Sequence, residues 1–350
     1  MPSFLSMRKH HRHDEQKASP PRFGGQRMPS SKRSLVTATT IAGATLAAIA
    51  LALLVEWALT RPQNFPAANG PSSAEQGQAQ PSTSLERASA QPSWPTGANT
   101  GVPAGTTLRP SGSITVTTPG AVIDSLLVTG TITVLANNVT IMRTKVVGDG
   151  IFNGDDAYSG TKIIDTEIDG QKRSGYTRGI SYSDYSCVRC NIHGVGQGIA
   201  ASNNVELRDS WIHDLIGEGD PANGGSHNEA VLSNGGTNIT VVNNRLDSGS
   251  GPQFSSSLSL YGDFAPVRDV LVQGNLFNGG GYCVYAGSAP GKPYPVAFNT
   301  RFIDNSFGRS VFAKCGYYGP ATAYQAVNGN QWLGNRWQDG SGAVDVTQNP

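Results

Sequence analysis

The stretch Val241-Val-Asn-Asn-Arg-Leu246 contains the pattern that decides the fold. The apolar Val241 is followed three places later by the polar Asn244 and five places later by the apolar Leu246. The pattern recurs nine times at intervals of 19 to 34 residues, with no polar residue at either apolar position. The repeats begin at Val122, Ile141, Ile163, Cys187, Leu207, Val241, Val272, Phe302 and Trp332.

Such a repeat predicts a solenoid, in which each coil buries one face by stacking on neighbours about 4.8 Å away. The polar residue three places after the start of each repeat is expected at an inward-pointing bend, where it bonds the backbone of adjacent coils. Four consecutive repeats carry Asn there, which predicts a ladder of buried amides. Its members are Asn244, Asn275, Asn305 and Asn335, and earlier coils carry Ser125, Thr144, Thr166, Cys190 and Ser210.

Two other solenoids do not fit this sequence. A leucine-rich repeat would show a dominant Leu pattern together with helical segments, and neither is present. A left-handed hexapeptide helix would keep a strict period of six residues, which the observed intervals break.

The segments Asn138-Val-Thr-Ile, Asn204-Val-Glu-Leu and Asn238-Ile-Thr-Val resemble coils of the right-handed parallel β-helix proteins of the pectate-lyase-like superfamily. The resemblance covers roughly residues 101–350 and implies an all-β domain. The superfamily includes lyases, hydrolases, epimerases and non-catalytic adhesins, so the resemblance leaves the activity open.

The N-terminal part of the chain predicts a membrane anchor. Leu35–Val55 is an uncharged apolar run, and at 1.5 Å per residue its 21 residues measure about 31 Å, the thickness of a hydrocarbon core. Eight Lys/Arg in residues 1–34 face only two acidic residues, which predicts a cytoplasmic N-terminus. We therefore expect a cytoplasmic tail (1–34), a single-pass signal anchor in the cell membrane (35–59) and an extracellular remainder. A cleaved signal peptide is the alternative.

Composition divides the predicted extracellular part in two. Residues 60–100 are rich in Pro, Ser, Ala, Gln and Gly and predict a flexible linker, and residues 101–350 carry the repeats. From Arg61 onward 18 basic residues face 22 acidic ones, which argues against a nucleic-acid partner. The sequence favours a monomer. Cys187 and Cys190 fall at buried repeat positions, and Cys283 and Cys315 lie in successive coils where a disulfide fits.

In the pectate-lyase-like superfamily the substrate usually lies along one parallel sheet, between flanking loops. We place that sheet at the short strands following each repeat, with Val231 and Val311 among its inward residues. One outer residue per coil is then expected two positions earlier. These residues are Asp149, Arg178, Gln197, Glu229, Ser256, Tyr282, Arg309 and Gly342.

A second column of polar residues is expected six places after the start of the repeats. It consists of Asp169, His193, His213 and Asp247. The bland interpretation of these residues is structural, with the carboxylates neutralising stacked histidines or capping turns.

The longest insert supplies further titratable groups. It contains Glu218, Asp220 and His227 and leads into His227-Asn-Glu-Ala-Val231, which resembles a His-x-Asp-Gly-Ile strand entry of related bacterial β-helix proteins. Glu229 replaces the Asp of that motif and Ala230 its Gly.

These residues allow three functions on a polysaccharide or cell-wall glycan. A polysaccharide lyase would use Arg178 against a uronate carboxylate and His227 or His213 as the base, with Glu229 beside them. A glycoside hydrolase would pair Glu229 with Asp220 or Glu218. Gln197, His193, Tyr282 and Glu218 are expected to bind the substrate. The sequence names no metal ligands, and a bound Ca²⁺ is open as a substitute for Arg178.

The third function is a non-catalytic glycan- or cell-wall-binding module. It requires a row of exposed aromatic rings rather than a catalytic constellation. Five tyrosines are available for such a row, namely Tyr261, Tyr282, Tyr285, Tyr317 and Tyr318.

Overall fold

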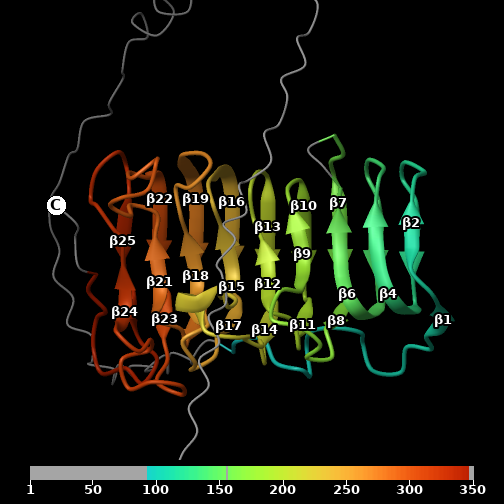
Figure 1. The fold of residues 1–350 in the computed structure, drawn as a ribbon, viewed down its shortest axis with the longest axis horizontal. Coiled ribbons are helices and arrows are strands. Elements are labelled where there is room, and N and C mark those ends of the chain that lie inside the picture. Colours follow the sequence, from blue (N-terminus) through green and yellow to red (C-terminus); the bar gives the residue numbers. More distant parts are fainter. Residues whose placement is uncertain (1–92, 155–156, 347–350) are drawn as a thin grey trace, which may run out of the picture. The chain divides into compact units, whose positions relative to one another are not determined.

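The computed structural model describes residues 93–154 and 157–346. This part of the chain forms twenty-six strands, all paired in parallel, and one short 3-10 helix, η1 (Pro221–Asn223). The strands stack coil upon coil in three rows, which makes the domain an all-β, parallel β-helix-like solenoid (Figure 1). The predicted fold class is confirmed to this extent.

The first row is the nine-stranded sheet, whose strands carry the start of each repeat. In spatial order it contains β3 (Val122–Asp124), β5 (Thr140–Met142), β7 (Thr161–Ile164), β10 (Tyr185–Val188), β13 (Val205–Arg208), β16 (Gly236–Val242), β19 (Val267–Gln273), β22 (Phe298–Ile303) and β25 (Gln331–Leu333).

The second row belongs to the seventeen-stranded sheet and carries the apolar residue that lies five places after the start of each repeat. It contains β8 (Glu167–Asp169), β11 (Asn191–His193), β14 (Trp211–His213), β17 (Arg245–Asp247), β20 (Leu276–Asn278), β23 (Ser306–Phe307) and β26 (Arg336–Trp337).

The third row belongs to the same sheet and follows the second along each coil. The long strands β4 (Leu126–Val134) and β6 (Lys145–Asn153) span both rows, and β1 (Arg109–Ser111) and β2 (Ile114–Val116) pair with β4. The third row contains β9 (Arg178–Tyr182), β12 (Gln197–Ala200), β15 (Asn228–Ser233), β18 (Phe254–Leu260), β21 (Tyr282–Ala286) and β24 (Gly319–Thr322).

Strand pairing follows the predicted repeat in eight of the nine coils, from Ile141 to Trp332. The first repeat was predicted one residue too early, because Ile123 rather than Val122 pairs with Ile141 and Val128 pairs with Val146. Val122 is 61% exposed. Adjacent apolar residues make both registers equally hydrophobic there, and only the pairing decides between them.

The predicted amide ladder is confirmed, since Asn244, Asn275, Asn305 and Asn335 are all buried. The Asn275 side chain accepts from the backbone N–H of Asn244 (2.9 Å), and its own amide donates to the carbonyl of Val241 (2.8 Å). The same pattern repeats toward Asn335, so each side chain bonds backbone groups of neighbouring coils.

The predicted inward position of Val311 is wrong. Ala321 on β24 takes the place that pairs with Val284, and Val311 lies outside any strand. The reason is an insert, since residues 308–318 form a loop before the strand begins.

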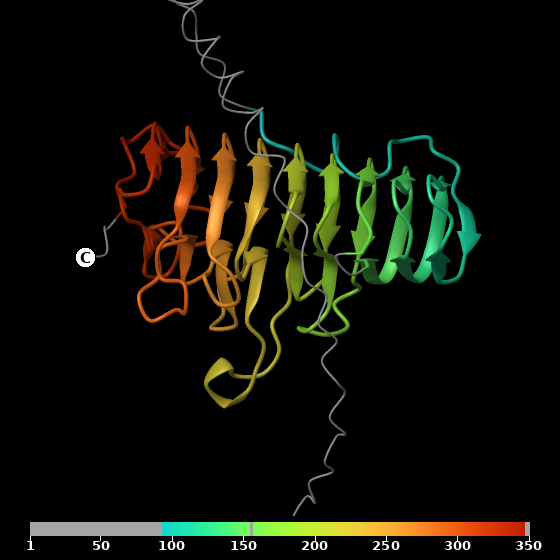
Figure 2. The ribbon, with the colours of Figure 1, turned by 90° about the horizontal axis from the view of Figure 1, so that it is seen from above.

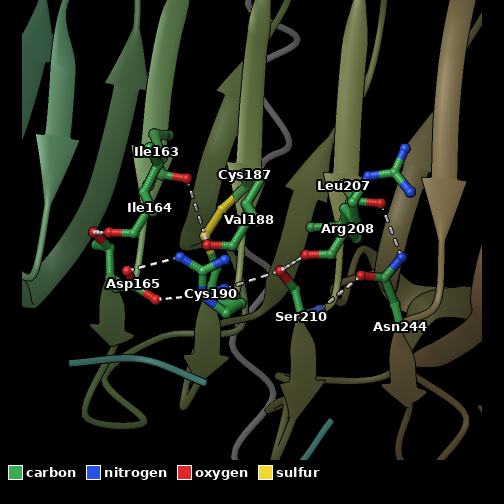
Figure 3. The surroundings of a disulfide bond; sticks show 12 residues. Ile163, Ile164, Asp165, Cys187, Val188, Cys190, Leu207, Arg208, Ser210 and Asn244 are labelled. Atoms are coloured by element: carbon green, nitrogen blue, oxygen red, sulfur yellow. Dashed lines mark hydrogen bonds and ion pairs between the residues drawn. A yellow bond between two sulfur atoms is a disulfide. The ribbon is translucent and has the colours of Figure 1, made fainter. Parts of the chain in front are cut away.

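Both disulfides are buried and leave no free cysteine among the described residues. The predicted Cys283–Cys315 bridge is confirmed. Cys187 is also bonded to Cys190, and the backbone N–H of Cys190 donates to Ser210 Oγ (2.9 Å), the next member of its column (Figure 3). The sequence placed both residues in the core but did not predict this bond, because packing alone explained them.

Residues 93–108 form a strap across the corner between the first and second rows. The indole Nε1 of Trp94 donates to Gly274 O (3.3 Å), and Gly101 N donates to Arg189 O (2.8 Å) in an earlier coil. The strap therefore runs from a later coil toward the earlier coils, opposite to the order of the coils in the sequence. It begins within the predicted linker. In residues 93–154 and 157–346 no helix is long and apolar enough to cross a membrane. The predicted tail, anchor and most of the linker lie outside the described residues.

Candidate functional site

The outer face of the second row carries the predicted polar column. Asp169, His193 and His213 occupy paired positions on β8, β11 and β14. The two imidazole rings stack at 5.2 Å between centroids, and His213 also stacks on Trp211 at 3.6 Å. The indole Nε1 of Trp211 donates to Asp247 (2.9 Å), so the column continues onto β17.

Charges within this column neutralise one another. Glu167 Oε1 lies 2.8 Å from Lys145 Nζ and 3.1 Å from His193 Nε2. The hydrogen bond from His193 and the contact with Lys145 lower the pKa of Glu167 to about 2, against the opposing effect of burial. Burial lowers the pKa of His213, although the neighbouring Asp214 opposes the shift.

Glu167, Asp169 and His193 could together present three ligand atoms to a metal ion. The Lys145 ammonium is already 2.8 Å from Glu167 and 3.8 Å from Asp169, and it supplies the positive charge that a cation would bring. The strap crosses the same row, because a Cβ on Gly101 would lie 3.0 Å from Asn191 Cβ. We conclude that the column links successive coils and that the strap packs on the same row.

The third row brings Arg178, Gln197 and Glu229 together in three successive coils. Arg178 pairs with Gln197, and the next residues inward, Ile199 and Val231, pair as well. The Arg178 Nε–H donates to Gln197 Oε1, and Gln197 Nε2 donates to Glu229 Oε2 at 3.2 Å. Arg178 also donates to the hydroxyl of Tyr182 (2.8 Å). No ion pair joins Arg178 to a carboxylate of the described residues, so its charge remains available.

Glu229 is only 2% exposed, and its environment favours the protonated form. Burial raises the pKa of the Glu229 carboxyl, while hydrogen bonds from Ser255 and Gln197 and the charge of Arg178 oppose the shift. A buried acid whose pKa is raised can donate a hydrogen bond or a proton to a bound molecule.

A bend explains why these polar side chains do not enter the apolar core although they lie two positions from a core residue. A Cβ on Gly198 would lie 2.6 Å from Cγ2 of the buried Ile212, so Gly198 faces the core, as does Ile199 after it. The alternation of the strand is therefore interrupted between Gln197 and Ile199. The sequence signal for this bend is the recurring triplet of a polar residue, a small residue and Ile or Val. It occurs at Asp149, Arg178, Gln197 and Glu229.

The five tyrosines of the predicted row lie in one continuous cluster beside Glu229. Ring centroids are separated by 5.3 Å for Tyr261 and Tyr285, 5.6 Å for Tyr285 and Tyr282, 5.6 Å for Tyr282 and Tyr318, and 5.0 Å for Tyr318 and Tyr317. Burial raises the pKa of Tyr285 to about 12, with smaller contributions from Tyr282, Tyr318 and Glu229.

The long insert forms a wall beside this face and projects from the stack around η1 (Figure 2). Glu218 accepts from Ser174 Oγ (2.9 Å) and from Gly175 N (3.0 Å), which joins the insert to the loop of an earlier coil. Asp220 caps η1 by accepting from Ala222 N (3.1 Å). Both carboxylates therefore have structural partners.

His227 is exposed, and within the described residues no hydrogen bond or ion pair joins it to Glu229 or Arg178. The intervening Asn228 is buried and donates to Gly175 O (2.7 Å) and Gly196 O (2.8 Å). The strand register shifts between Asn228 and Glu229, which removes the simple alternation that would place both neighbours on one face.

The fold and this face define a parallel β-helix-like solenoid with an outer strip that passes from charged and amide groups to tyrosine rings. We call this strip the third-row groove; it contains Arg178, Gln197, Glu229 and the five clustered tyrosines. Comparison of the chain with protein-family models, curated proteins and solved structures found no match.

Proposed function

We propose that the third-row groove binds an extended carbohydrate chain. The chain would then be a right-handed parallel β-helix protein related to the pectate-lyase-like superfamily. Its Leu35–Val55 segment would anchor it in the cell membrane and hold the solenoid outside on a linker. Cell-wall or other extracellular polysaccharide is the expected partner.

One observation carries this proposal: polar groups and aromatic rings follow one another along the third row, from Arg178 on β9 to Tyr318 just before β24. Sugar rings present hydroxyl groups at their edges and C–H groups on their faces. The partly exposed guanidinium of Arg178 suits the hydroxyl or carboxylate groups. Gln197, whose amide already bonds Arg178 and Glu229, would hold that guanidinium in place. Tyrosine rings offer a flat apolar face with a polar tip, which suits the C–H faces.

The full chain, purified in detergent, should bind a polysaccharide in a screen of neutral and uronate polymers. Tyr282→Ala and Arg178→Gln should each lower the affinity at least tenfold without changing the unfolding temperature. Leu333→Ala, which alters an exposed apolar residue on the first row, is the matched control. Binding that is unchanged in both groove variants would refute the assignment of the groove.

Arg178 beside a buried Glu229 also favours a second candidate, a lyase acting on an acidic polysaccharide. In this reaction the guanidinium would neutralise a uronate carboxylate, and a base, for which His227 is the predicted residue, would remove the neighbouring proton. Ultraviolet absorbance of new double bonds measures this reaction directly. His227→Ala and Arg178→Ala should each remove most of the activity, and absence of any absorbance change across uronate polymers would leave binding alone. A hydrolase pairing Glu229 with Asp220 or Glu218 has less support, since both partners already have structural contacts.

A further inference from the structure

An aromatic pocket of about 280 Å³ lies in the wall of the third-row groove. Its sides are Phe254, Phe312, Tyr317 and Tyr318, and the backbone of Gly280 and Gly281 lines it as well. We propose that this pocket binds a neutral, single-ring aromatic group carried by the carbohydrate in the groove. That the aromatic group is carried by a carbohydrate rests on the proposed function, whereas binding of the aromatic group itself does not.

The ring geometry favours an aromatic guest over a sugar. Phe312 and Tyr317 meet at 77° with centroids 5.8 Å apart, and Tyr317 and Tyr318 meet at 87°. Mutually perpendicular rings present both edges and faces to the same space, which is the arrangement that a further arene completes. Tyr317 and Tyr318 are 65% and 64% exposed, so this apolar surface lacks the cover that core rings receive.

The pocket carries no charge of its own. No Lys, Arg, Asp or Glu is among its lining residues, and its remaining members are Ser250, Gly251 and Pro252. The group that enters the pocket is therefore uncharged, and any charge of the ligand stays outside in solvent. This excludes a uronate carboxylate and fits a phenyl or hydroxyphenyl group.

The wall of the pocket is fastened before any ligand arrives. The Cys283–Cys315 disulfide ties the loop to β21, and the N–H groups of Tyr317 and Tyr318 donate to the carbonyls of Gly280 (2.9 Å) and Gly281 (2.8 Å). A preformed site avoids the entropy cost of ordering a loop on binding.

Tyr318 belongs to both sites. One contact is the ring of Tyr282, a member of the groove, and its other neighbours are the pocket residues. A sugar stacked near Tyr282 would therefore carry a substituent directly into the pocket. The expected ligand class is a polysaccharide bearing phenolic acyl esters or aryl ethers.

The probe for the pocket is methyl 4-hydroxybenzoate, a neutral arene without a sugar. Saturation-transfer NMR on the full chain in detergent should show saturable binding. Gly281→Val should weaken it at least tenfold, because a Cβ at this position meets Ser255 O at 3.4 Å and the Tyr318 ring at 3.5 Å, ordinary contacts that fill space without strain. Gly112→Val, where a Cβ meets nothing within 4 Å, should leave binding unchanged, and both variants share the same detergent background.

Two outcomes separate this inference from the proposed function. Arene binding that depends on Gly281, without binding of any polysaccharide, keeps the pocket and refutes the carbohydrate groove. Polysaccharide binding with no arene signal, or with a signal equal in wild type and Gly281→Val, refutes the pocket and keeps the groove. If Gly281→Val unfolds at a lower temperature, Tyr317→Ala replaces it, because it removes one exposed wall and should also weaken the arene at least tenfold.

Discussion

The second and third rows of the solenoid both carry a column of polar side chains, yet they use these side chains differently. In the second row, Glu167 is paired with Lys145 and His193, and Trp211 lies against His213. In the third row, Arg178 has no ion pair with a described carboxylate, and the tyrosine cluster ends in the exposed rings of Tyr317 and Tyr318. A column whose members satisfy one another stabilises the stack, whereas a column with unused capacity can bind a ligand.

The largest expected effect comes from the bond that fixes the aromatic end of the groove. Replacing both Cys283 and Cys315 by Ala should lower the free energy of unfolding by about 3–4 kcal/mol, because the bond closes a loop of 32 residues. Carbohydrate affinity should fall as well, since the loop carrying Tyr317 and Tyr318 loses its anchor. Denaturant unfolding and binding are measured on the same samples. Full stability in the double variant would show that the backbone bonds alone hold this wall.

Alanine substitution of one aromatic residue in each row tests the two columns directly. Trp211→Ala should cost about 2 kcal/mol of unfolding free energy, since it removes the stack on His213 and the bond to Asp247, and carbohydrate affinity should stay within twofold. Tyr318→Ala should do the reverse, with a stability change below about 0.5 kcal/mol and a tenfold loss of affinity. The comparison fails if both variants lose the same property.

Glu167 and Glu229 should give pH dependences of opposite sign. The folded-state pKa of Glu167 is lowered to about 2, so its contribution is complete above pH 4.5 and is lost as the pH falls toward 2. The pKa of Glu229 is raised, so stability declines as the pH rises above 4.5 and stops declining once the folded-state pKa is passed.

Thermal unfolding across pH 2–8 measures both effects, and the effect of Glu167 is on the order of 1 kcal/mol after solvent screening. Glu167→Gln should flatten the acid side of the profile, and Glu229→Gln should flatten the decline above pH 4.5. The assigned environments are wrong if either variant changes the opposite side.

The smallest effect is expected at Asp220, which caps η1. Asp220→Ala should cost less than about 1 kcal/mol, and Asp220→Asn should restore the cap. Neither variant should alter carbohydrate binding. If Asp220→Asn removes a hydrolytic activity while stability is kept, Asp220 works as a catalytic acid and not only as a cap.

Candidate site residues were predictable to the extent that they follow the repeat. The column from Arg178 to Glu229 was found because one polar residue precedes each core residue by two positions, and pairing confirms its alignment. His227 shows the limit of that reasoning. The backbone shifts register after Asn228, and sequence spacing does not reveal such a shift. The bond between Cys187 and Cys190 was missed because two core positions of one coil explain both residues without it.

The repeat specifies the coil, because an apolar residue can occupy it only where stacking buries that residue, and Asn244 to Asn335 can be buried only as a ladder. The sequence also indicates the five tyrosines as one set, although it does not give their order in space. Which column has all of its polar groups paired, and which keeps an unpaired cation and exposed rings, is not visible in the repeat. That difference depends on contacts between coils 19 to 34 residues apart and on the strap that lies across the second row. Local patterns specify what is buried, and pairing between distant coils specifies which polar groups remain free to bind.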